Sequence, residues 1–511
     1  MKSRKSFIKV LITIIALCLM VAAGGMIYLN YTIKKFNELP YIKSIPISSL
    51  SERDNHLKST IRVDPSVILH EISPFIYGSS WANWIDVLPP KAEIKMLNTS
   101  IVRFGGNDFS RFDPVTETFY KQEGKQQLKH PIGEAAAWFS SNGSQVILQI
   151  NMLGIAIDPV TKEQLSISFP QDATGFIENI KREHGVDIKY VNLDNEPFIW
   201  SDTHRDLHPA PTSYAEYSNK FIAYAKALKE YDKDIMIMGP ENCNPYFYYR
   251  SNSSEDKENG VWIEYFLKIC RDYEKNNNVR LLDILSVHRY PIFRKANGTE
   301  VIASDQQILN SAKDWWDETY KDPIDPYYGS GIIPKLRRMI DENYPNTKLA
   351  ITEYNLDYDS NIKYDPVIRA VWLADTLGIF AQTGVDYANY WNLQESGEQG
   401  LISNGQLTIN KETYGEKRPS FYSFYLMSNF LRGSLIKAES NNENIKVYSA
   451  LDQGKVNIIV INSDAQNDYQ SNILANGLLV DGKSYLFKSR SITVFEVKNE
   501  QVNIYSCEFS D

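Results

Sequence analysis

Cysteines and metal-binding patterns are scarce in this chain of 511 residues. Of its four cysteines, Cys18 lies in an apolar N-terminal run. Cys243, Cys270 and Cys507 are too few to form a disulfide framework in so long a chain. No Cys-x-x-Cys or His-x-x-x-His spacing marks a metal site. We therefore expect no metal in the active site and no other cofactor, while a structural calcium on acidic loops such as Asp357–Asp365 stays open.

Basic residues are also fewer than acidic ones: the chain has 54 Lys and Arg and 63 Asp and Glu, for a net charge of -9. A nucleic-acid-binding protein needs clustered Lys and Arg to contact phosphates, so no nucleic-acid partner is expected. A Gly-rich nucleotide-binding turn is missing too, since Gly78-Ser79-Ser80-Trp81 follows the first apolar run of the main domain. This argues against a doubly wound open sheet and leaves neutral ligands such as glycans open.

Charged residues are absent from Val10 to Leu29, a run of 20 residues that is long enough to span a bilayer as a helix. The basic residues before the run predict that the rest of the chain faces outward. Cleaved signal peptides have a shorter apolar region of about 7 to 15 residues, but Val21-Ala22-Ala23 could serve as a cleavage site. We expect residues 1–33 to anchor an extracellular protein in the membrane, or to release a secreted one if they are cleaved.

Eight short apolar runs beyond residue 70 have the character of buried parallel strands. They are Phe75–Tyr77, Ser100–Phe104, Gln145–Ile150, Ile188–Leu193, Ile235–Met238, Ile284–Val287, Leu349–Thr352 and Val385–Trp391. Helical patterns such as Tyr214–Tyr231 and Ile368–Thr383 separate the later runs. Eight strand–helix units predict an α/β fold, a (β/α)8 TIM barrel over residues 70–415.

The pattern becomes rich in short strands after the barrel, which indicates a second domain. A helix-like segment over 419–431 comes first. The expected strands are Lys446–Ala450, Val456–Asn462, Lys483–Phe487 and Ser491–Val497, with turn formers between them. We predict an all-β sandwich domain built from residues 56–69 and 432–511, preceded by a linker over 34–55. A monomer is expected.

Two glutamates end apolar runs where such a barrel places its active site. Glu196 follows the fourth run in YVNLDNEPFIW, and Glu353 ends the seventh in KLAITEYN. Active sites of these barrels are assembled from the carboxyl ends of several strands, on one face. Glycoside hydrolysis needs a proton donor and a second carboxylate. Either glutamate alone would suggest an ordinary strand-end carboxylate, but the pair predicts a glycosidase, and the 12% aromatic content suits a carbohydrate binder.

Four stretches along the barrel carry a more specific signal. They are Arg103–Asn107 (RFGGN), Leu193–Glu216, Ser286–Pro291 (SVHRYP) and Lys348–Asn355 (KLAITEYN). Together they resemble glycoside hydrolase family 44, which comprises endoglucanases and xyloglucanases of clan A. The resemblance implies a barrel with a β-sandwich made from both chain ends, as the strand pattern already suggests, and a β-glucan polysaccharide as the substrate.

The resemblance also implies roles for the residues at the strand ends. Glu196 would be the general acid/base and Glu353 the nucleophile of a retaining, double-displacement reaction. A charged Glu353 nearby should raise the pKa of Glu196, which must stay protonated. Arg103 would hold Glu353 charged, and Tyr290 would donate a hydrogen bond to it.

The remaining candidates would bind or orient the substrate. Asn195 would bind the 2-hydroxyl of the reacting sugar, a contact that strengthens in the transition state. His288 would orient the network of carboxyl groups. Trp391, Trp81 and Trp200 are candidates for stacking on sugar rings, although a place in the core is the ordinary alternative for any tryptophan.

Two other functions stay open. Another clan A glycosidase, such as a xylanase, mannanase or arabinofuranosidase, would share the carboxyl pair but have a different pocket. A membrane-tethered glycan-binding protein without turnover is the second alternative. The presence of both glutamates with Arg103 and Tyr290 argues against it, because a binding module gains nothing from a buried pair of like charges.

Overall fold

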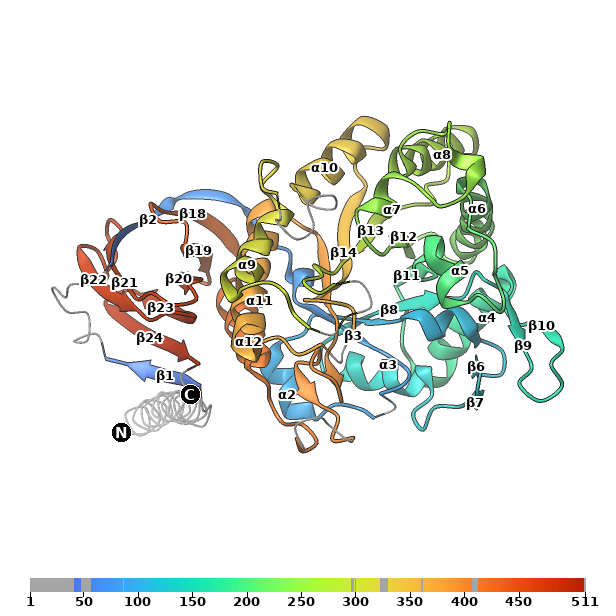
Figure 1. Cartoon of the computed structure of the whole chain (residues 1–511), viewed down its shortest axis with the longest axis horizontal. Helices are drawn as coiled ribbons and strands as arrows, with labels where there is room; N and C mark the ends of the chain where they lie inside the picture. Colours follow the sequence, from blue (N-terminus) through green and yellow to red (C-terminus); the bar gives the residue numbers. More distant parts are fainter. Residues whose placement is uncertain are drawn as a thin grey trace, which may run out of the picture.

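The computed structural model describes residues 41–46, 57–85, 87–295, 298, 300–321, 330–359, 362–406 and 412–509. The predicted anchor over residues 1–33 lies outside this part of the chain, as does most of the expected linker. Within the described ranges, no helix combines the length and the apolar character that crossing a membrane requires. The chain forms a barrel with a curled β-sheet beside it (Figure 1).

Eight parallel strands close into the predicted barrel. In order around the barrel they are β3 (Gly78–Trp81), β4 (Ile101–Phe104), β8 (Gln145–Ile150), β11 (Tyr190–Leu193), β12 (Met236–Asn242), β13 (Ile284–Arg289), β14 (Lys348–Tyr354) and β15 (Tyr387–Tyr390). Inside the barrel, Ile147, Met238 and Ile284 from three of these strands pack together. The barrel interior is therefore a filled core that holds the strand ends in fixed positions.

A layer of helices surrounds the strands (Figure 1). They are α2 (Lys91–Leu97), α3 (Ile132–Ser141), α4 (Pro170–His184), α6 (Tyr214–Tyr231), α8 (Trp262–Asn277), α10 (Ile332–Asn343), α11 (Pro366–Thr383) and α12 (Pro419–Phe430). In α8 the buried Trp262, Phe266 and Cys270 recur every fourth residue, which is the pattern of a helix with one buried face. In α11 nearly every residue is buried because the helix contacts both α12 and strands of the β-sheet domain.

Short elements in the loops enlarge the face of the barrel where the strands end. After β4 come η3 (Asn107–Arg111), β5 (Phe112–Asp113), β6 (Thr118–Lys121) and β7 (Gly124–Gln126); after β8 come β9 (Ile155–Ile157) and β10 (Gln164–Ser166). The later loops carry η4 (Pro197–Ile199), α5 (Trp200–Thr203), α7 (Tyr246–Tyr249), η5 (Ser254–Asp256), α9 (Asp305–Asn310), η6 (Ser311–Trp315), β16 (Gln394–Glu395) and β17 (Ile402–Ser403).

The second domain is a nine-stranded sheet in the order β1-β24-β23-β20-β19-β18-β2-β21-β22. Its strands are β1 (Ile42–Ile45), β2 (Leu57–Glu71), β18 (Ser434–Ser440), β19 (Ile445–Asp452), β20 (Lys455–Asn462), β21 (Tyr469–Leu474), β22 (Lys483–Phe487), β23 (Ser491–Lys498) and β24 (Gln501–Glu508). Alternate residues of β20 face opposite sides, so Ile459 and Ile461 join the core shared with the barrel while Ile458 and Val460 belong to a separate core. The sheet thus forms the predicted β-sandwich from both ends of the chain.

Two predictions about the strands differ from the structure. The first barrel strand was placed at Phe75–Tyr77, but it is β3, three residues later. Pro74–Ile76 instead forms a 3-10 turn, η2, because the Ser73 side chain accepts the N–H of Phe75 (3.2 Å) and Pro74 suits the first helical position. The linker expected over 34–55 is interrupted by β1, whose Ile42 is buried and pairs with Cys507 of β24.

Candidate active site

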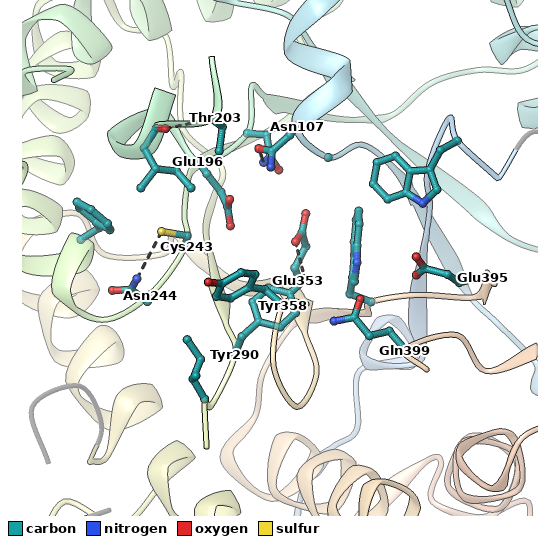
Figure 2. A pocket seen from close by; sticks show the side chains of 17 residues that line it. Asn107, Glu196, Thr203, Cys243, Asn244, Tyr290, Glu353, Tyr358, Glu395 and Gln399 are labelled. Atoms are coloured by element: carbon teal, nitrogen blue, oxygen red, sulfur yellow. Dashed lines mark hydrogen bonds between the residues drawn. The ribbon is translucent and has the colours of Figure 1, made fainter. Parts of the chain in front are cut away.

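The two predicted glutamates lie at the carboxyl ends of β11 and β14, and both line one cavity (Figure 2). Beyond β11 the backbone of Asp194 (φ 63°) and of Glu196 (φ 43°) takes the left-handed conformation. This conformation is uncommon for residues with a side chain. The N–H of Glu196 donates to the carbonyl of Glu241 in β12 (3.1 Å), which fixes the turn that carries the carboxyl group.

The carboxyl groups of Glu196 and Glu353 are close together. One oxygen of each and one ring nitrogen of His288 all lie within 4.8 Å of one another. Carboxyl groups of retaining glycosidases are about 5 to 5.5 Å apart, whereas inverting enzymes keep about 6.5 to 9.5 Å between them to admit a water. This spacing suits direct attack by one carboxylate on the sugar.

Glu353 accepts strong hydrogen bonds on both of its oxygens. Arg103 in β4 donates to Oε1 (2.6 Å), and the hydroxyl of Tyr290 donates to Oε2 (2.6 Å). Burial, and then the neighbouring Glu353 carboxylate, raise the pKa of the Tyr290 hydroxyl well above its usual value, so the tyrosine stays protonated and remains a donor. Both oxygens of Glu353 are thus held by donors, one of them a cation, as suits a carboxylate that acts as a nucleophile.

Glu196 has the opposite environment. Burial raises the pKa of its carboxyl group above the ordinary value, and the Glu353 carboxylate adds to the rise, while the bond and charge of His288 lower it in part. A raised pKa keeps a carboxyl group protonated at higher pH, which suits a general acid. The two glutamates thus differ in the way that separate acid and nucleophile roles need.

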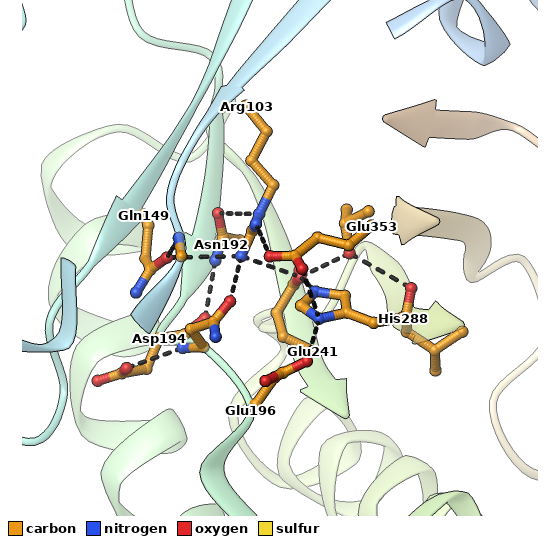
Figure 3. A network of polar contacts seen from close by, with 12 residues as sticks. Arg103, Gln149, Asn192, Asp194, Glu196, Glu241, His288 and Glu353 are labelled. Carbon is orange, nitrogen blue, oxygen red and sulfur yellow. Dashed lines mark hydrogen bonds and ion pairs between the residues drawn. The ribbon is translucent and has the colours of Figure 1, made fainter. Parts of the chain in front are cut away.

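Arg103 holds the centre of a buried polar network (Figure 3). Besides Glu353 it donates to Asn195 (2.8 Å), Asn192 (3.3 Å) and Gln149 (3.4 Å). Burial disfavours its charge, but the carboxylates of Glu241 and Glu353 outweigh this and raise the pKa of Arg103. Asn195 also donates to Asn107 (2.9 Å) beside the cavity.

Asp194 organises the turn beneath Glu196, a role that the sequence analysis missed. Its buried carboxylate accepts the backbone N–H groups of Met152 (2.5 Å), Leu153 (2.9 Å) and Asn195 (2.8 Å), and the hydroxyl of Ser110. These bonds tie the loop after β8 to the turn after β11. Its position two residues before Glu196, at the end of an apolar run, was the available signal.

The cavity has a volume of about 720 Å³ and extends to both sides of the carboxyl pair. Figure 2 shows Thr203, Cys243 and Asn244 on the side of Glu196, and Glu395 and Gln399 on the far side of Glu353. Trp84 and Trp391 also line it, with ring centroids 5.6 Å apart. A cavity that continues past the reacting position in both directions can hold sugars on either side of a cleaved bond.

Of the three tryptophans proposed to stack on sugars, only Trp391 lines this cavity. Trp81 is fully buried, packs on Phe104, and donates its ring N–H to the carbonyl of Val87 (3.2 Å). Trp200 is also fully buried and donates its ring N–H to the carbonyl of Asn195 (2.9 Å). Neither ring can reach a sugar, so these two assignments are corrected: Trp81 is a core residue, and Trp200 supports the Asn195–Glu196 turn from behind.

Two further residues at the site were missed. Trp84, three residues after Trp81, takes the place in the cavity that the sequence analysis gave to Trp81. Glu241 ends an apolar run in β12, as Glu353 does in β14, and bonds to His288 (2.8 Å). The same criterion that selected Glu196 and Glu353 would have selected it.

The grouping of Glu196, His288 and Glu353 also has a spacing that could hold a metal ion. Its chemistry does not fit one, because a ligating histidine must be neutral. Burial opposes the charge of His288, but the neighbouring carboxylates, Glu353 first, raise its pKa to about 9. At neutral pH His288 therefore donates from both ring nitrogens and has no lone pair for a metal.

Residues 118–292 match the model of glycoside hydrolase family 44. The chain thus resembles this family over those residues, which include Glu196 and His288. It is 29% identical over 308 residues to endoglucanase A of Paenibacillus lautus, an alignment that covers 57% of this chain but only 41% of that relative. The chain therefore spans less than half the length of this curated relative.

Solved structures share the fold. A bifunctional glucanase-xylanase from a metagenome library has a TM-score of 0.71 at 20% identity and covers 86% of this chain and 99% of its own. A family 44 xyloglucanase from Paenibacillus polymyxa has a TM-score of 0.67 at 18% identity, with 88% and 99% covered. At these identities the likeness concerns the arrangement of barrel and β-sandwich.

Proposed function

We propose that this protein is a retaining endo-β-1,4-glucanase or xyloglucanase that acts outside the cell as a monomer. The observation that carries the proposal is the close pair of buried carboxyl groups, of which Glu196 has a raised pKa and Glu353 is bound by Arg103 and Tyr290. The family and the names of its relatives, an endoglucanase and a xyloglucanase among them, support a β-glucan as the substrate.

The reaction follows from the two environments. Glu353 attacks the anomeric carbon while protonated Glu196 gives its proton to the leaving glycosidic oxygen. The glycosyl–enzyme ester is then hydrolysed by a water that ionised Glu196 deprotonates. Asn195, held by Arg103 and Asn107, would meet the 2-hydroxyl of the reacting sugar.

The test of substrate class is a panel of β-1,4-glucan, xyloglucan, xylan, mannan and an arabinofuranoside. We expect the highest kcat/KM on one of the first two. Activity confined to the arabinofuranoside, xylan or mannan would identify another clan A specificity. Hydrolysis of none by purified enzyme would favour the glycan-binding alternative.

Cleavage within the chain is expected because the cavity continues on both sides of the carboxyl pair. Early products from β-1,4-glucan should be mixed oligosaccharides, and the viscosity of a soluble derivative should drop before much reducing sugar appears. Chromatography of the first few per cent of reaction measures this. A monosaccharide as the sole early product would contradict an open cleft.

Retention of anomeric configuration is expected from the spacing of the carboxyl groups. Proton NMR during the first minutes of cello-oligosaccharide hydrolysis should show the β-anomer, and the α-anomer should grow in only as mutarotation proceeds. An α-anomer at the earliest times would mean inversion, with water as the nucleophile.

Membrane attachment is proposed from the uncharged run over Val10–Leu29. Cells that express the full chain should carry the enzyme in the membrane fraction, and a variant without residues 1–33 should be soluble. A soluble wild-type form that starts near residue 24 would show that the segment is a cleaved signal.

A further inference from the structure

Glu241 is a third carboxyl group beside the catalytic pair, and it does not touch the cavity. Its side chain is completely buried, and its backbone has a φ of 58°, in the region where a non-glycine residue is under strain. Two donors bind its Oε2: the hydroxyl of Thr352 (2.5 Å) and Nε2 of His288 (2.8 Å). A guanidinium nitrogen of Arg103 lies 3.6 Å from the same oxygen.

These contacts keep Glu241 ionised. Burial alone would raise its pKa, but the charges of Arg103 and His288 outweigh burial and lower the pKa below the ordinary value. A buried carboxylate is costly unless cations and hydrogen-bond donors offset the loss of water, as Arg103 and His288 do here. Of these two cations, His288 also contacts Glu196.

His288 links Glu241 to the acid/base. Its Nε2 faces Glu241, and its Nδ1 lies 2.9 Å from Oε1 of Glu196 (Figure 3). A carboxylate only accepts hydrogen bonds, so ionised Glu241 requires a proton on Nε2. The second proton, on Nδ1, decides which oxygen of Glu196 carries the acid proton.

The two states of His288 have different consequences for catalysis. Charged His288 donates from Nδ1 to Oε1 of Glu196, so the acid proton must reside on Oε2, the oxygen that His288 leaves free for the leaving group. Neutral His288 has an acceptor at Nδ1 and would bind the acid proton itself. Glu196 would then point its proton away from the glycosidic oxygen.

We propose that Glu241 is a positioning residue that holds His288 doubly protonated and thereby directs the proton of Glu196 toward the leaving group. The inference rests on the proposed function, since it assigns a purpose to Glu241 within that reaction. It adds a third carboxylate to the two that the reaction itself uses.

Several charged or titratable groups face Glu241 and His288. Around Glu241 and His288 they are Arg103 of β4, Glu196 after β11, Tyr217 of α6, Glu353 of β14 and, beyond Glu353, Tyr290. Burial and the nearby Glu241 raise the pKa of Tyr217 well above its usual value, so it stays neutral. When Glu196 is protonated, the two positive charges of Arg103 and His288 balance the two negative charges of Glu241 and Glu353. Replacing Glu241 by glutamine removes one of these negative charges.

The direct test is the titration of His288 by NMR in full-length protein labelled with ¹⁵N-histidine. The seven histidines make the spectrum tractable, and a His288→Gln variant assigns the signal. In the wild type His288 should remain doubly protonated until pH about 9. In Glu241→Gln its midpoint should fall by about 1 to 3 pH units, the usual effect of an adjacent opposite charge. An unchanged midpoint would overturn the proposal, and this readout needs no catalytic activity.

The kinetic test compares two leaving groups. On a cello-oligosaccharide, which needs the acid proton, Glu241→Gln should lower kcat/KM by about 10- to 100-fold, part of the roughly 10²- to 10⁴-fold that general acid catalysis contributes. On dinitrophenyl β-cellobioside, which needs no proton, the change should stay within about threefold. Equal loss on both substrates would mean that Glu241 acts through Arg103 on the nucleophile, and the proposal would be wrong.

A double-mutant cycle tests whether Glu241 acts through His288. The quantity compared is the leaving-group ratio, which is kcat/KM on dinitrophenyl β-cellobioside divided by kcat/KM on the cello-oligosaccharide. If Glu241 acts through His288, then Glu241→Gln should have no further effect on this ratio in a His288→Gln background. Independent, additive effects would contradict the link. Asp375→Asn is the matched control, because Asp375 is another buried carboxyl group, bonded to Tyr448 (2.6 Å) away from the cavity. It should change thermal stability but not the leaving-group ratio.

Failure of the inference and failure of the proposed function remain distinguishable. If wild-type enzyme hydrolyses neither β-1,4-glucan nor xyloglucan, the proposed function is wrong, and the His288 titration still reports whether Glu241 sets the charge of the histidine. If wild-type enzyme is active and the titration does not move in Glu241→Gln, only the inference fails.

Discussion

Replacing Glu353 by alanine should abolish hydrolysis of every glycoside substrate, however good its leaving group. Without this carboxylate no glycosyl–enzyme can form, and a proton from Glu196 cannot compensate. The expected loss in kcat is roughly 10⁵- to 10⁶-fold, the scale seen where a covalent nucleophile is removed. Rates on cello-oligosaccharide and on dinitrophenyl β-cellobioside should fall together, because both reactions begin with the same attack.

Rescue of the Glu353→Ala variant by added azide is the control for this prediction. In Glu353→Ala the space left by the carboxylate can admit azide, which attacks the anomeric carbon directly and should yield the α-glycosyl azide. Recovery of activity with that product would show that the variant is folded and that its acid residue still works. A β-glycosyl azide from this variant would mean that the roles of Glu353 and Glu196 are reversed.

The positions of the two proposed catalytic glutamates could be predicted from the sequence for a physical reason. In a closed parallel barrel all strands end at one face, so a polar residue directly after an apolar run must lie at that face. Glu196 and Glu353 follow the fourth and seventh runs, and the structure brings them together at the ends of β11 and β14. The position of a strand end is thus enough to locate a carboxyl group.

The direction of a side chain is harder to predict than the position of a strand end. Trp81 and Trp84 both follow the first strand pattern, yet Trp81 is fully buried and Trp84 lines the cavity. Three residues in an irregular turn can point to any side, and no periodicity applies there. The tryptophan proposed for stacking was therefore the wrong one of the two.

Supporting contacts depend on segments that are distant in sequence, which also limits prediction. Asp194 accepts the N–H groups of Met152 and Leu153 from the loop of another strand, and Glu241 reaches His288 on the next strand of the barrel. Nothing in the local sequence of Asp194 or Glu241 identifies these partners. Strand β1 likewise depends on a distant segment, because these four residues are recognisable as a strand only by their pairing with β24.

Replacing Glu196 by alanine should slow the hydrolysis of substrates with poor leaving groups much more than the first step on substrates with good ones. Cello-oligosaccharide hydrolysis should fall by about 10²- to 10⁴-fold, the usual contribution of general acid–base catalysis. Dinitrophenolate leaves as a stable anion, so the first step on dinitrophenyl β-cellobioside should survive. The second step lacks its base, and a burst of dinitrophenolate followed by a slow steady state should reveal the accumulated glycosyl–enzyme.

The pH profile tests the same role in the wild type. Burial, with help from the Glu353 carboxylate, raises the pKa of Glu196, so the acid form persists to higher pH than for an ordinary glutamate. Activity on cello-oligosaccharide should decline as the pH rises through that raised pKa. The first step on dinitrophenyl β-cellobioside needs no acid, so its rate should not show this alkaline decline. An alkaline limb common to both substrates would assign the titration to another group.

Azide completes the assignment of Glu196. It needs no general base, so in Glu196→Ala it should attack the accumulated glycosyl–enzyme from the face opposite Glu353 and release the β-glycosyl azide. The steady-state rate on dinitrophenyl β-cellobioside should then rise with azide concentration, while wild-type enzyme shows little response. Because a retaining mechanism needs the nucleophile and the acid/base on opposite faces of the reacting sugar, the two variants should give azides of opposite configuration. An α-glycosyl azide from Glu196→Ala would identify Glu196 as the nucleophile.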